Sequence, residues 1–304
     1  MLRIAAASLA ALLSALPLAG CTAPPSLTPE PTPQSRVDRD WPDAENTGVP
    51  DGLSLASYVG PCTIATDNTV IDAMLVDCDR LRIVARNVTI TRTRINGRID
   101  TPDPGDGKYA FSFTIEDSEV HVGDVLGVTG IKQGNFVARR IEVTGGARSI
   151  HCESNCTIED SWIHSQASDP LGEAHISGIR MSQSLILRHN TLLCEAVRLP
   201  GKGACSAALT GYGDWAPVQD NLIEGNLFQP GSASYCAYGG STKKKPFSSG
   251  TRGIRFIDNV FVRGPTGKCG TYGPVGSFDP SRPGNQWRDN IWDDGTPVAT
   301  PTYR

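Results

Sequence analysis

The chain has no excess of positive charge and contains only one long uncharged apolar run. Its 304 residues include 28 Lys and Arg against 32 Asp and Glu, so the formal net charge is −4 and no nucleic-acid partner is expected. Hydrophobic residues make up 39% of the chain, which excludes disorder over its whole length. Glycine (32) and proline (22) are both abundant, so the chain turns often and a helical bundle is not expected.

The apolar run, Ile4–Gly20, follows a short basic start that contains Arg3. This order is typical of a secretion signal, and a run of 17 residues is marginal for a helix that spans a membrane. The run ends at Leu18-Ala19-Gly20-Cys21, which resembles a bacterial lipobox. It predicts a signal peptide over 1–20 and a lipid on Cys21; the alternative is an ordinary secretion signal. Residues 21–40 are rich in Pro and Thr and are expected to form a disordered tether.

A lipid on Cys21 would place the protein on the extracellular face of the bacterial cell membrane. The lipid would then be its only contact with the membrane, and without the lipid the protein would be secreted. We expect a monomer.

A short motif recurs through the rest of the chain: alternating apolar residues, a polar corner, then a second short apolar strand. Such strands with glycine-rich punctuation indicate an all-β fold, and spacings of 20 to 36 residues indicate a solenoid. The copies are 67–75, 87–95, 112–120, 135–143, 155–163, 184–192, 220–228, 253–261 and 284–292. They predict a right-handed, single-stranded parallel β-helix of about nine coils over residues 41–304, with 41–66 as its N-terminal cap.

Polar positions of the motif also form rows. Asparagine recurs at the corner, where it tolerates a left-handed bend and can hydrogen-bond to the next coil; the row is Asn190, Asn226, Asn259 and Asn290. Charges alternate just before this corner, as in Glu159 and Arg188, and we interpret them, with His189, as surface ladders. His121 and His164 share one repeat position two coils apart, so we interpret them as stacked surface residues.

Nine cysteines leave eight when Cys21 carries the lipid, and an even number in an oxidising compartment favours four disulfides. Cys236 and Cys269 lie at the same distance from their repeat starts, within disulfide reach in adjacent coils. Closeness in sequence suggests the remaining pairs, Cys62–Cys78, Cys152–Cys156 and Cys194–Cys205. A metal site is the alternative, with plausible spacing for zinc, and would use His151, Cys152, Cys156 and His164. We expect disulfides and no metal.

The third strand of each coil is expected to carry the functional face. If Ile150 and Ile179 point inward, their successors point outward on one strip; these are Lys132, His151, Arg180 and Thr210. Tyrosines continue the strip in later coils, and a long loop adds an acid and an indole; these are Tyr212, Tyr238, Tyr272, Asp214 and Trp215. Cations suit uronate carboxylates, and aromatic rings can stack on sugars.

Three stretches carry a resemblance to known proteins: WPDAENTGVP, CAYGGSTKKKPFSSG and SRPGNQWRDNIWDDGT. Over about residues 41–297 the chain resembles secreted right-handed parallel β-helix proteins of actinobacteria, in a lipoprotein form. These are similar to distant members of the pectin-lyase-like superfamily, whose enzymes cleave or epimerise acidic polysaccharides in a groove along one sheet. The resemblance implies a polysaccharide partner, by likeness of fold alone.

The residues then favour a particular chemistry. A polygalacturonase-like site needs closely spaced aspartates and a pectate-lyase-like site needs a calcium-binding carboxylate cluster, but the strip has few carboxylates. We therefore expect metal-independent, lyase-type cleavage, with His151 or Tyr212 as the base and Arg180 or Lys132 at the uronate. Lys132, Asp214, Trp215, Tyr238 and Tyr272 would bind the substrate.

Other functions remain open. The protein could bind glycan without cleaving it, or be a structural lipoprotein of the cell envelope. No cofactor is expected, although Asp100, Asp103 and Asp106 could hold calcium in place of forming an ordinary acidic turn.

Overall fold

The computed structural model describes residues 36–105, 110–196 and 205–303. Cys21, the signal segment 1–20 and most of the predicted tether lie outside these residues, as does Asp106. The described chain forms two all-parallel sheets, of 10 and 15 strands, which wind into a parallel β-helix. In this part of the chain no helix is long and apolar enough to cross a membrane; Arg36 and Val37 have helical backbone, and η1 (Ser248–Gly250) is a single helical turn.

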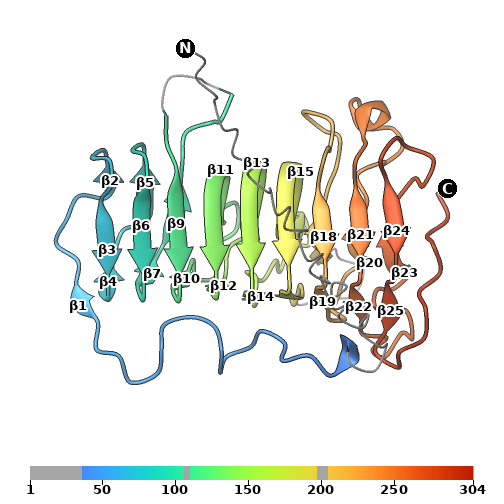
Figure 1. Ribbon diagram of the computed structural model, residues 1–304, viewed down its shortest axis with the longest axis horizontal. Helices are drawn as coiled ribbons and strands as arrows, with labels where there is room; N and C mark the ends of the chain where they lie inside the picture. Colours follow the sequence, from blue (N-terminus) through green and yellow to red (C-terminus); the bar gives the residue numbers. More distant parts are fainter. Residues whose placement is uncertain (1–35, 106–109, 197–204, 304) are drawn as a thin grey trace, which may run out of the picture. The chain divides into compact units, whose positions relative to one another are not determined.

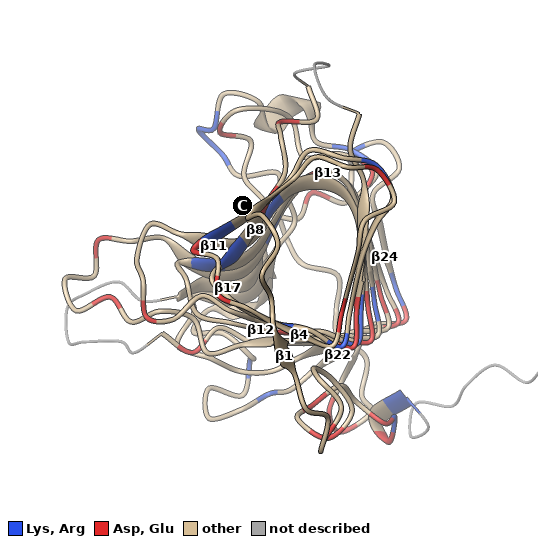
Figure 2. Cartoon of the chain, turned by 90° about the vertical axis from the view of Figure 1, so that its left-hand side faces the viewer, with Lys and Arg blue, Asp and Glu red and all other residues tan. Residues whose placement is uncertain are grey.

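Three faces enclose the core, and Figure 2 shows them along the axis of the coils. Face 1, in front in Figure 1, consists of β3 (Val70–Asp72), β6 (Val88–Thr91), β9 (Phe113–Glu116), the second halves of β11 (Thr129–Arg139), β13 (Arg148–Glu159) and β15 (Ile176–Arg188), β18 (Leu222–Glu224), β21 (Arg255–Ile257) and β24 (Gln286–Arg288).

Face 2 is the sheet of ten strands. It consists of β1 (Ala56–Ser57), β4 (Met74–Val76), β7 (Arg94–Asn96), β10 (Glu119–His121), β12 (Glu142–Thr144), β14 (Trp162–His164), β16 (Thr191–Leu192), β19 (Leu227–Phe228), β22 (Val260–Phe261) and β25 (Ile291–Trp292). Face 3 consists of β2 (Thr63–Ile64), β5 (Arg80–Ile83), β8 (Arg98–Asp100), the first halves of β11, β13 and β15, β17 (Cys205–Thr210), β20 (Tyr235–Tyr238) and β23 (Gly273–Gly276).

The predicted register of the coils is confirmed. On face 1, Ile90 pairs with Ile115 and Leu187 with Ile223; on face 2, Phe228 pairs with Phe261. These side chains are buried, and the rings of Phe228 and Phe261 stack with centroids 4.8 Å apart. One coil cannot bury such rows alone, so neighbouring coils stabilise each other.

The asparagine row at the corner forms a hydrogen-bonded ladder. Asn190 Nδ2 donates to Asn226 Oδ1 over 2.9 Å, and Asn226 Nδ2 donates to Asn259 Oδ1 over 3.0 Å. The expectation that these asparagines adopt the left-handed bend is wrong. The preceding residue does so, as at His189 (φ 48°) and Asp258 (φ 56°), which leaves each asparagine amide free to bridge the coils.

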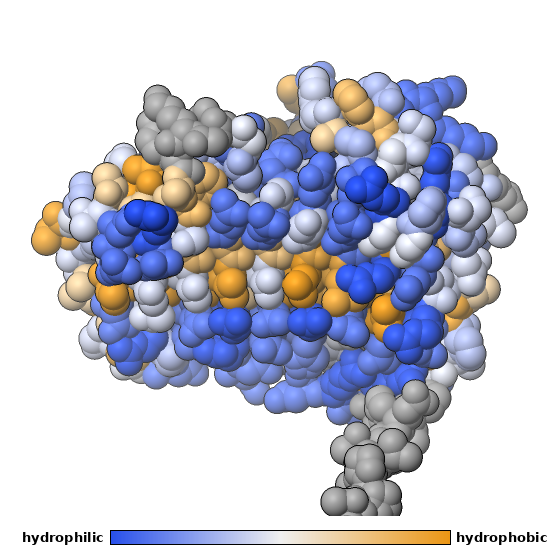
Figure 3. All heavy atoms as spheres, turned by 45° about the horizontal axis from the view of Figure 1, so that its top comes forward, coloured by the Kyte–Doolittle hydropathy of each residue, from blue (hydrophilic) through white to orange (hydrophobic). Residues whose placement is uncertain are grey.

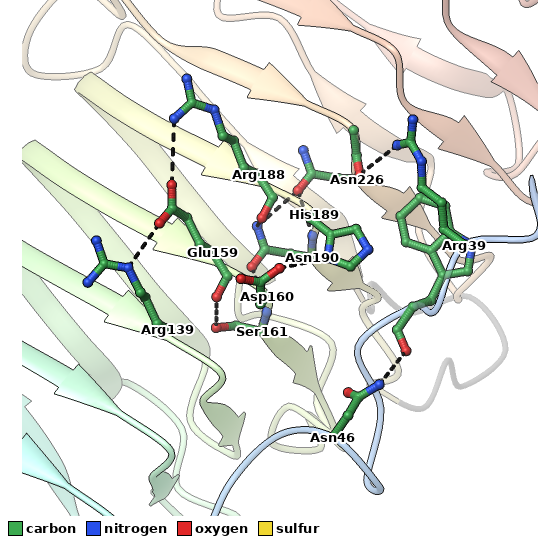
Figure 4. A network of polar contacts seen from close by, with 12 residues as sticks. Arg39, Asn46, Arg139, Glu159, Asp160, Ser161, Arg188, His189, Asn190 and Asn226 are labelled. Carbon is green, nitrogen blue, oxygen red and sulfur yellow. Dashed lines mark hydrogen bonds and ion pairs between the residues drawn. The ribbon is translucent and has the colours of Figure 1, made fainter. Parts of the chain in front are cut away.

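Charges beside this corner pair as expected of a ladder (Figure 4). Arg139 Nη1 lies 2.8 Å from Glu116 Oε1 and Arg139 Nε lies 3.1 Å from Glu159 Oε2. Arg188 lies between Glu159 and Glu224 in the same way. These side chains are partly exposed, so each pair contributes about 0–1 kcal/mol.

The segment 36–49, called the strap below, runs along the stack of coils in the direction opposite to their order in the sequence. Arg36 and Arg39 both pair with Asp258 beside β22. Further along, the ring of Trp41 stacks on that of His189, with centroids 5.4 Å apart. At its other end, the Val49 N–H donates to Glu119 Oε1 in β10. Part of the predicted tether, Arg36–Asp40, belongs to this strap.

Four disulfides link the predicted cysteines: Cys62–Cys78, Cys152–Cys156, Cys194–Cys205 and Cys236–Cys269. The alternative metal site is therefore wrong, because the sulfurs of Cys152 and Cys156 are bonded to each other. Its two histidines also lie on different faces, since His151 is in the face-3 half of β13 and His164 is in β14.

Replacing Asn226 with Ala is expected to lower the free energy of unfolding by about 2–3 kcal/mol, because buried partners on both sides lose their hydrogen bonds. Chemical denaturation measures this loss. The control is Asn96→Ala, at an exposed residue whose amide donates to Asp77, where we expect a change below about 0.5 kcal/mol. Equal losses in the two variants would contradict a stabilising role of the buried ladder.

Candidate functional site

The predicted strip on face 3 is present in the expected register. Lys132 pairs with His151, His151 with Arg180, and Arg180 with Thr210. Figure 2 shows basic residues gathered on this face near β8 and β11. The Thr210 side chain is buried (2% exposed) and donates to the Ile179 carbonyl over 3.3 Å, so it is covered rather than free on the surface.

A hollow of about 220 Å³ lies on the strip. It brings together three predicted site residues, Arg180, Tyr212 and Asp214. The other lining residues are Arg148, His175, Ser177, Ser206, Thr210 and Lys245.

Sequence reasoning missed Arg148 and Lys245 as site residues. Arg148 pairs with Ser177 of β15, and it lies three residues before His151, where strict alternation along a strand predicts the opposite face. No periodic signal marks Lys245, which lies in an irregular loop between β20 and β21.

Asp214 bridges two of the cations in the hollow. Its Oδ2 lies 2.9 Å from Arg180 Nη2 and its Oδ1 lies 2.6 Å from Lys245 Nζ. Burial raises the pKa of Asp214, but Lys245 and Arg180 outweigh burial and hold this pKa below its usual value. Asp214 is therefore a carboxylate at neutral pH, and it occupies the space between two cations.

Arg148 differs from these cations because it makes no ion pair with any residue that the structure describes. Burial lowers the pKa of Arg148, and the neighbouring Arg180 lowers it further. The guanidinium stays charged, since Arg does not lose its proton in proteins. A partly buried, unpaired guanidinium at a hollow is suited to an incoming anion with paired oxygens.

His151 lies beside this hollow among several cations, and one carboxylate oxygen, Glu153 Oε1, lies 3.1 Å from its Nε2. Its side chain is 17% exposed; burial first, then Arg180, Arg148 and Lys132, lower its pKa to about 3. The imidazole is therefore neutral at pH 7 and can accept a proton. Tyr212 is the opposite case, because burial and Tyr238 raise its pKa, so its phenol keeps its proton.

Tyrosines extend the site toward the C-terminal coils. The rings of Tyr212 and Tyr238 have centroids 5.1 Å apart, and Tyr235 lies 5.3 Å from Tyr238 and 6.0 Å from Tyr272. Tyr235 and Tyr272 line a second hollow of about 370 Å³. Tyr235 was missed in the sequence, where it stands first in the stretch YCAYGG. Trp215, which is 83% exposed, follows Asp214 in the chain.

Face 1 has a larger hollow, of about 750 Å³, within the apolar band that Figure 3 shows between two hydrophilic rows. Its lining combines threonines and aliphatic residues, including Thr114, Val137 and Ile186, with two serines, three asparagines and three phenylalanines. Of its described lining residues, only Asp220 and Arg255 are charged. This groove lacks the clustered cations and tyrosines of face 3, so the stronger site chemistry lies on face 3.

The acidic turn that could hold calcium has other partners. Asp100 Oδ2 lies 2.6 Å from Arg80 Nη2, and Asp103 Oδ1 accepts a hydrogen bond from the Gly105 N–H over 2.8 Å. Asp106, the third acid of the turn, lies outside the described residues. The two described acids thus already have a guanidinium and a backbone amide as partners.

Comparison of the chain with protein-family models, with curated proteins and with solved structures finds no match. The chemistry of the face-3 residues is therefore the guide to function.

The pKa of His151 is expected near 3 when followed by NMR, and to rise in Arg180→Gln because a repelling cation is lost. The folded-state pKa lies below the usual value of about 6.5, so the unfolded chain binds this proton more readily. His151 thus makes the free energy of unfolding fall as the pH drops from about 6.5 towards 3. A pKa near 6.5 in the unaltered protein would contradict this environment.

Proposed function

We propose that the protein binds acidic polysaccharide on face 3, with a uronate carboxylate held by Arg148. The observation that carries the proposal is the unpaired, partly buried guanidinium of Arg148 in a hollow with two further cations, Arg180 and Lys245. Asp214 neutralises only one of these three charges. A carboxylate from outside would therefore find excess positive charge and a bidentate donor in one place.

The tyrosine row supports a sugar polymer as the ligand rather than a small anion. Its rings run from the cationic hollow to the hollow at Tyr272. They offer apolar faces and hydroxyl groups along the direction in which coils stack, which suits successive sugars of an extended chain. The resemblance to secreted β-helix proteins of the pectin-lyase-like superfamily supports the same class of ligand.

The four disulfides fit an extracellular or other oxidising compartment. With the lipobox at Cys21, they support a protein that is lipid-anchored at the outer side of a cell membrane. Polysaccharide of the cell envelope or its surroundings would be within reach of such a protein.

Lyase-type cleavage is the second candidate, and the neutral His151 favours it. As a base, His151 would take the proton from the carbon next to the uronate carboxylate, where nearby cations stabilise the developing negative charge. A carbon–carbon double bond would form as the bond to the glycosidic oxygen breaks, and the phenol of Tyr212 would give that oxygen a proton. Binding of the uronate would also raise the pKa of His151 by offsetting the cations.

Replacing Arg148 with Ala is expected to weaken binding of an oligouronate by about 10- to 100-fold, as loss of a charge-assisted pair implies. Isothermal titration calorimetry measures the affinity. The matched control is Arg288→Ala in β24 of face 1, at a side chain that is 60% exposed, and it should bind as the unaltered protein does. Equal affinity for the oligouronate and its methyl ester would contradict a carboxylate site.

Cleavage is tested by the absorbance of an unsaturated uronate product on incubation with a panel of acidic polysaccharides. If the protein is a lyase, His151→Gln should abolish this absorbance while oligouronate affinity stays within about threefold, because the base is lost and the cations remain. Binding without product across the panel would assign the non-catalytic function instead.

A further inference from the structure

A second cluster of ionisable residues lies on face 2, on a different face from the proposed glycan site. Glu119 and His121 belong to β10, Glu142 to β12 and His164 to β14. One ligand atom from each of Glu119, His121 and Glu142 lies within 4.8 Å of the others. His164 Nε2 lies 2.9 Å from Glu142 Oε1, so a fourth possible ligand borders the cluster beside Glu142.

The two glutamates are direct neighbours in paired strands, an arrangement in which like charges repel. The negative charge of Glu119 is compensated, because Arg94 Nε lies 2.5 Å from its Oε2 and the Val49 N–H of the strap donates to its Oε1. Glu142 faces His164. With one arginine for two carboxylates, the pair retains a negative charge that a proton on histidine or a bound cation must balance.

Both ring nitrogens of His164 have polar partners. Nε2 lies 2.9 Å from Glu142 Oε1, and Nδ1 lies 2.8 Å from the Ser165 hydroxyl, which in turn lies 3.3 Å from Glu195 Oε2. Because a carboxylate oxygen only accepts hydrogen bonds, Nε2 carries a proton when no cation is bound, and a metal ion would take the place of that proton. A serine and carboxylate behind the ring are also typical of the outer shell of a metal-binding histidine.

His121 provides a nitrogen without a good partner. His121 Nε2 lies 3.1 Å from Glu119 Oε2, yet this buried nitrogen makes no hydrogen bond of acceptable geometry. Imidazole nitrogens and two carboxylates thus lie close together on face 2. Nitrogen and oxygen ligands of this kind suit a divalent first-row metal.

We propose that Glu119, His121, Glu142 and His164 bind a divalent transition metal ion, with Zn²⁺ as the best fit. Four ligands at about 2.0–2.1 Å make a closed, structural type of site, with ligand atoms about 3.3 Å apart. Glu119, His121 and Glu142 would draw together from their present spacing of up to 4.8 Å, and the His164 imidazole would move in beside Glu142. Since Glu119 also holds Val49, the ion would fasten the strap to three neighbouring coils.

Calorimetric titration of the full chain with Zn²⁺ is expected to show one tight site, and Zn²⁺ is expected to raise the melting temperature. Glu142→Gln and His164→Gln should each weaken this site by about 100-fold or more, because each removes a direct ligand while nearly keeping its shape. The matched control is His189→Gln, at a histidine that lies 2.7 Å from Asp160 under Trp41 and outside the cluster. It should bind Zn²⁺ unchanged.

Trp162 provides a local readout, because its ring stacks on His164 with centroids 3.5 Å apart. Co²⁺ should quench its fluorescence, and Trp162→Phe should remove the quenching but keep Zn²⁺ affinity. Zn²⁺ binding that Glu142→Gln and His164→Gln leave unchanged would overturn the proposal. So would a melting temperature that responds to His164 protonation but not to Zn²⁺, since a proton would then balance the glutamates.

Discussion

Stacking of equivalent residues about 4.8 Å apart in parallel strands is the constraint on which the rest of the structure depends. Each side chain in a coil meets the side chain at the same position in the next coil, so every position becomes a row. Apolar rows close the core, as in the pairing of Phe228 and Phe261, and the row of Asn190 and Asn226 satisfies buried polar groups at the corner. The environment of a residue in this fold is therefore set by its neighbours one coil away as well as by its neighbours in sequence.

Electrostatics separates the structural rows from the functional ones. At the corner of faces 1 and 2, acids and bases alternate from coil to coil, so Arg139 and Arg188 both find carboxylates. On face 3 the alternation stops after Asp100, and Lys132, His151 and Arg180 stand next to one another. Burial, together with repulsion by the neighbouring cations, lowers the pKa of His151. Folding stability does not explain a row of neighbouring cations, whereas binding of an anionic ligand would offset their repulsion.

The repeat in the sequence predicted the coils, their register and the Cys236–Cys269 pair, because each depends on spacing alone; the other three cysteine pairs were predicted from closeness in sequence. It also predicted that Lys132, His151 and Arg180 share a strip. The face-3 site also contains a residue that the repeat spacing does not predict, since Lys245 comes from an irregular loop. The position of the strap was likewise not predicted, because it lies beside β22 through Asp258, far from it in sequence. The corner asparagines were assigned the wrong backbone role, since residue type alone does not say which of two adjacent residues takes the left-handed bend.

The strap changes how the coils depend on one another. In a simple solenoid each repeat contacts only its neighbours, so the stack can fray from an end and unfold in pieces. Here one segment touches Asp258 near one end, His189 in the middle and Glu119 toward the other. Unfolding of any of these coils removes contacts of the same segment, so the stabilities of the coils are coupled. The strap thus gives a linear array of coils a long-range coupling and favours unfolding as one cooperative unit.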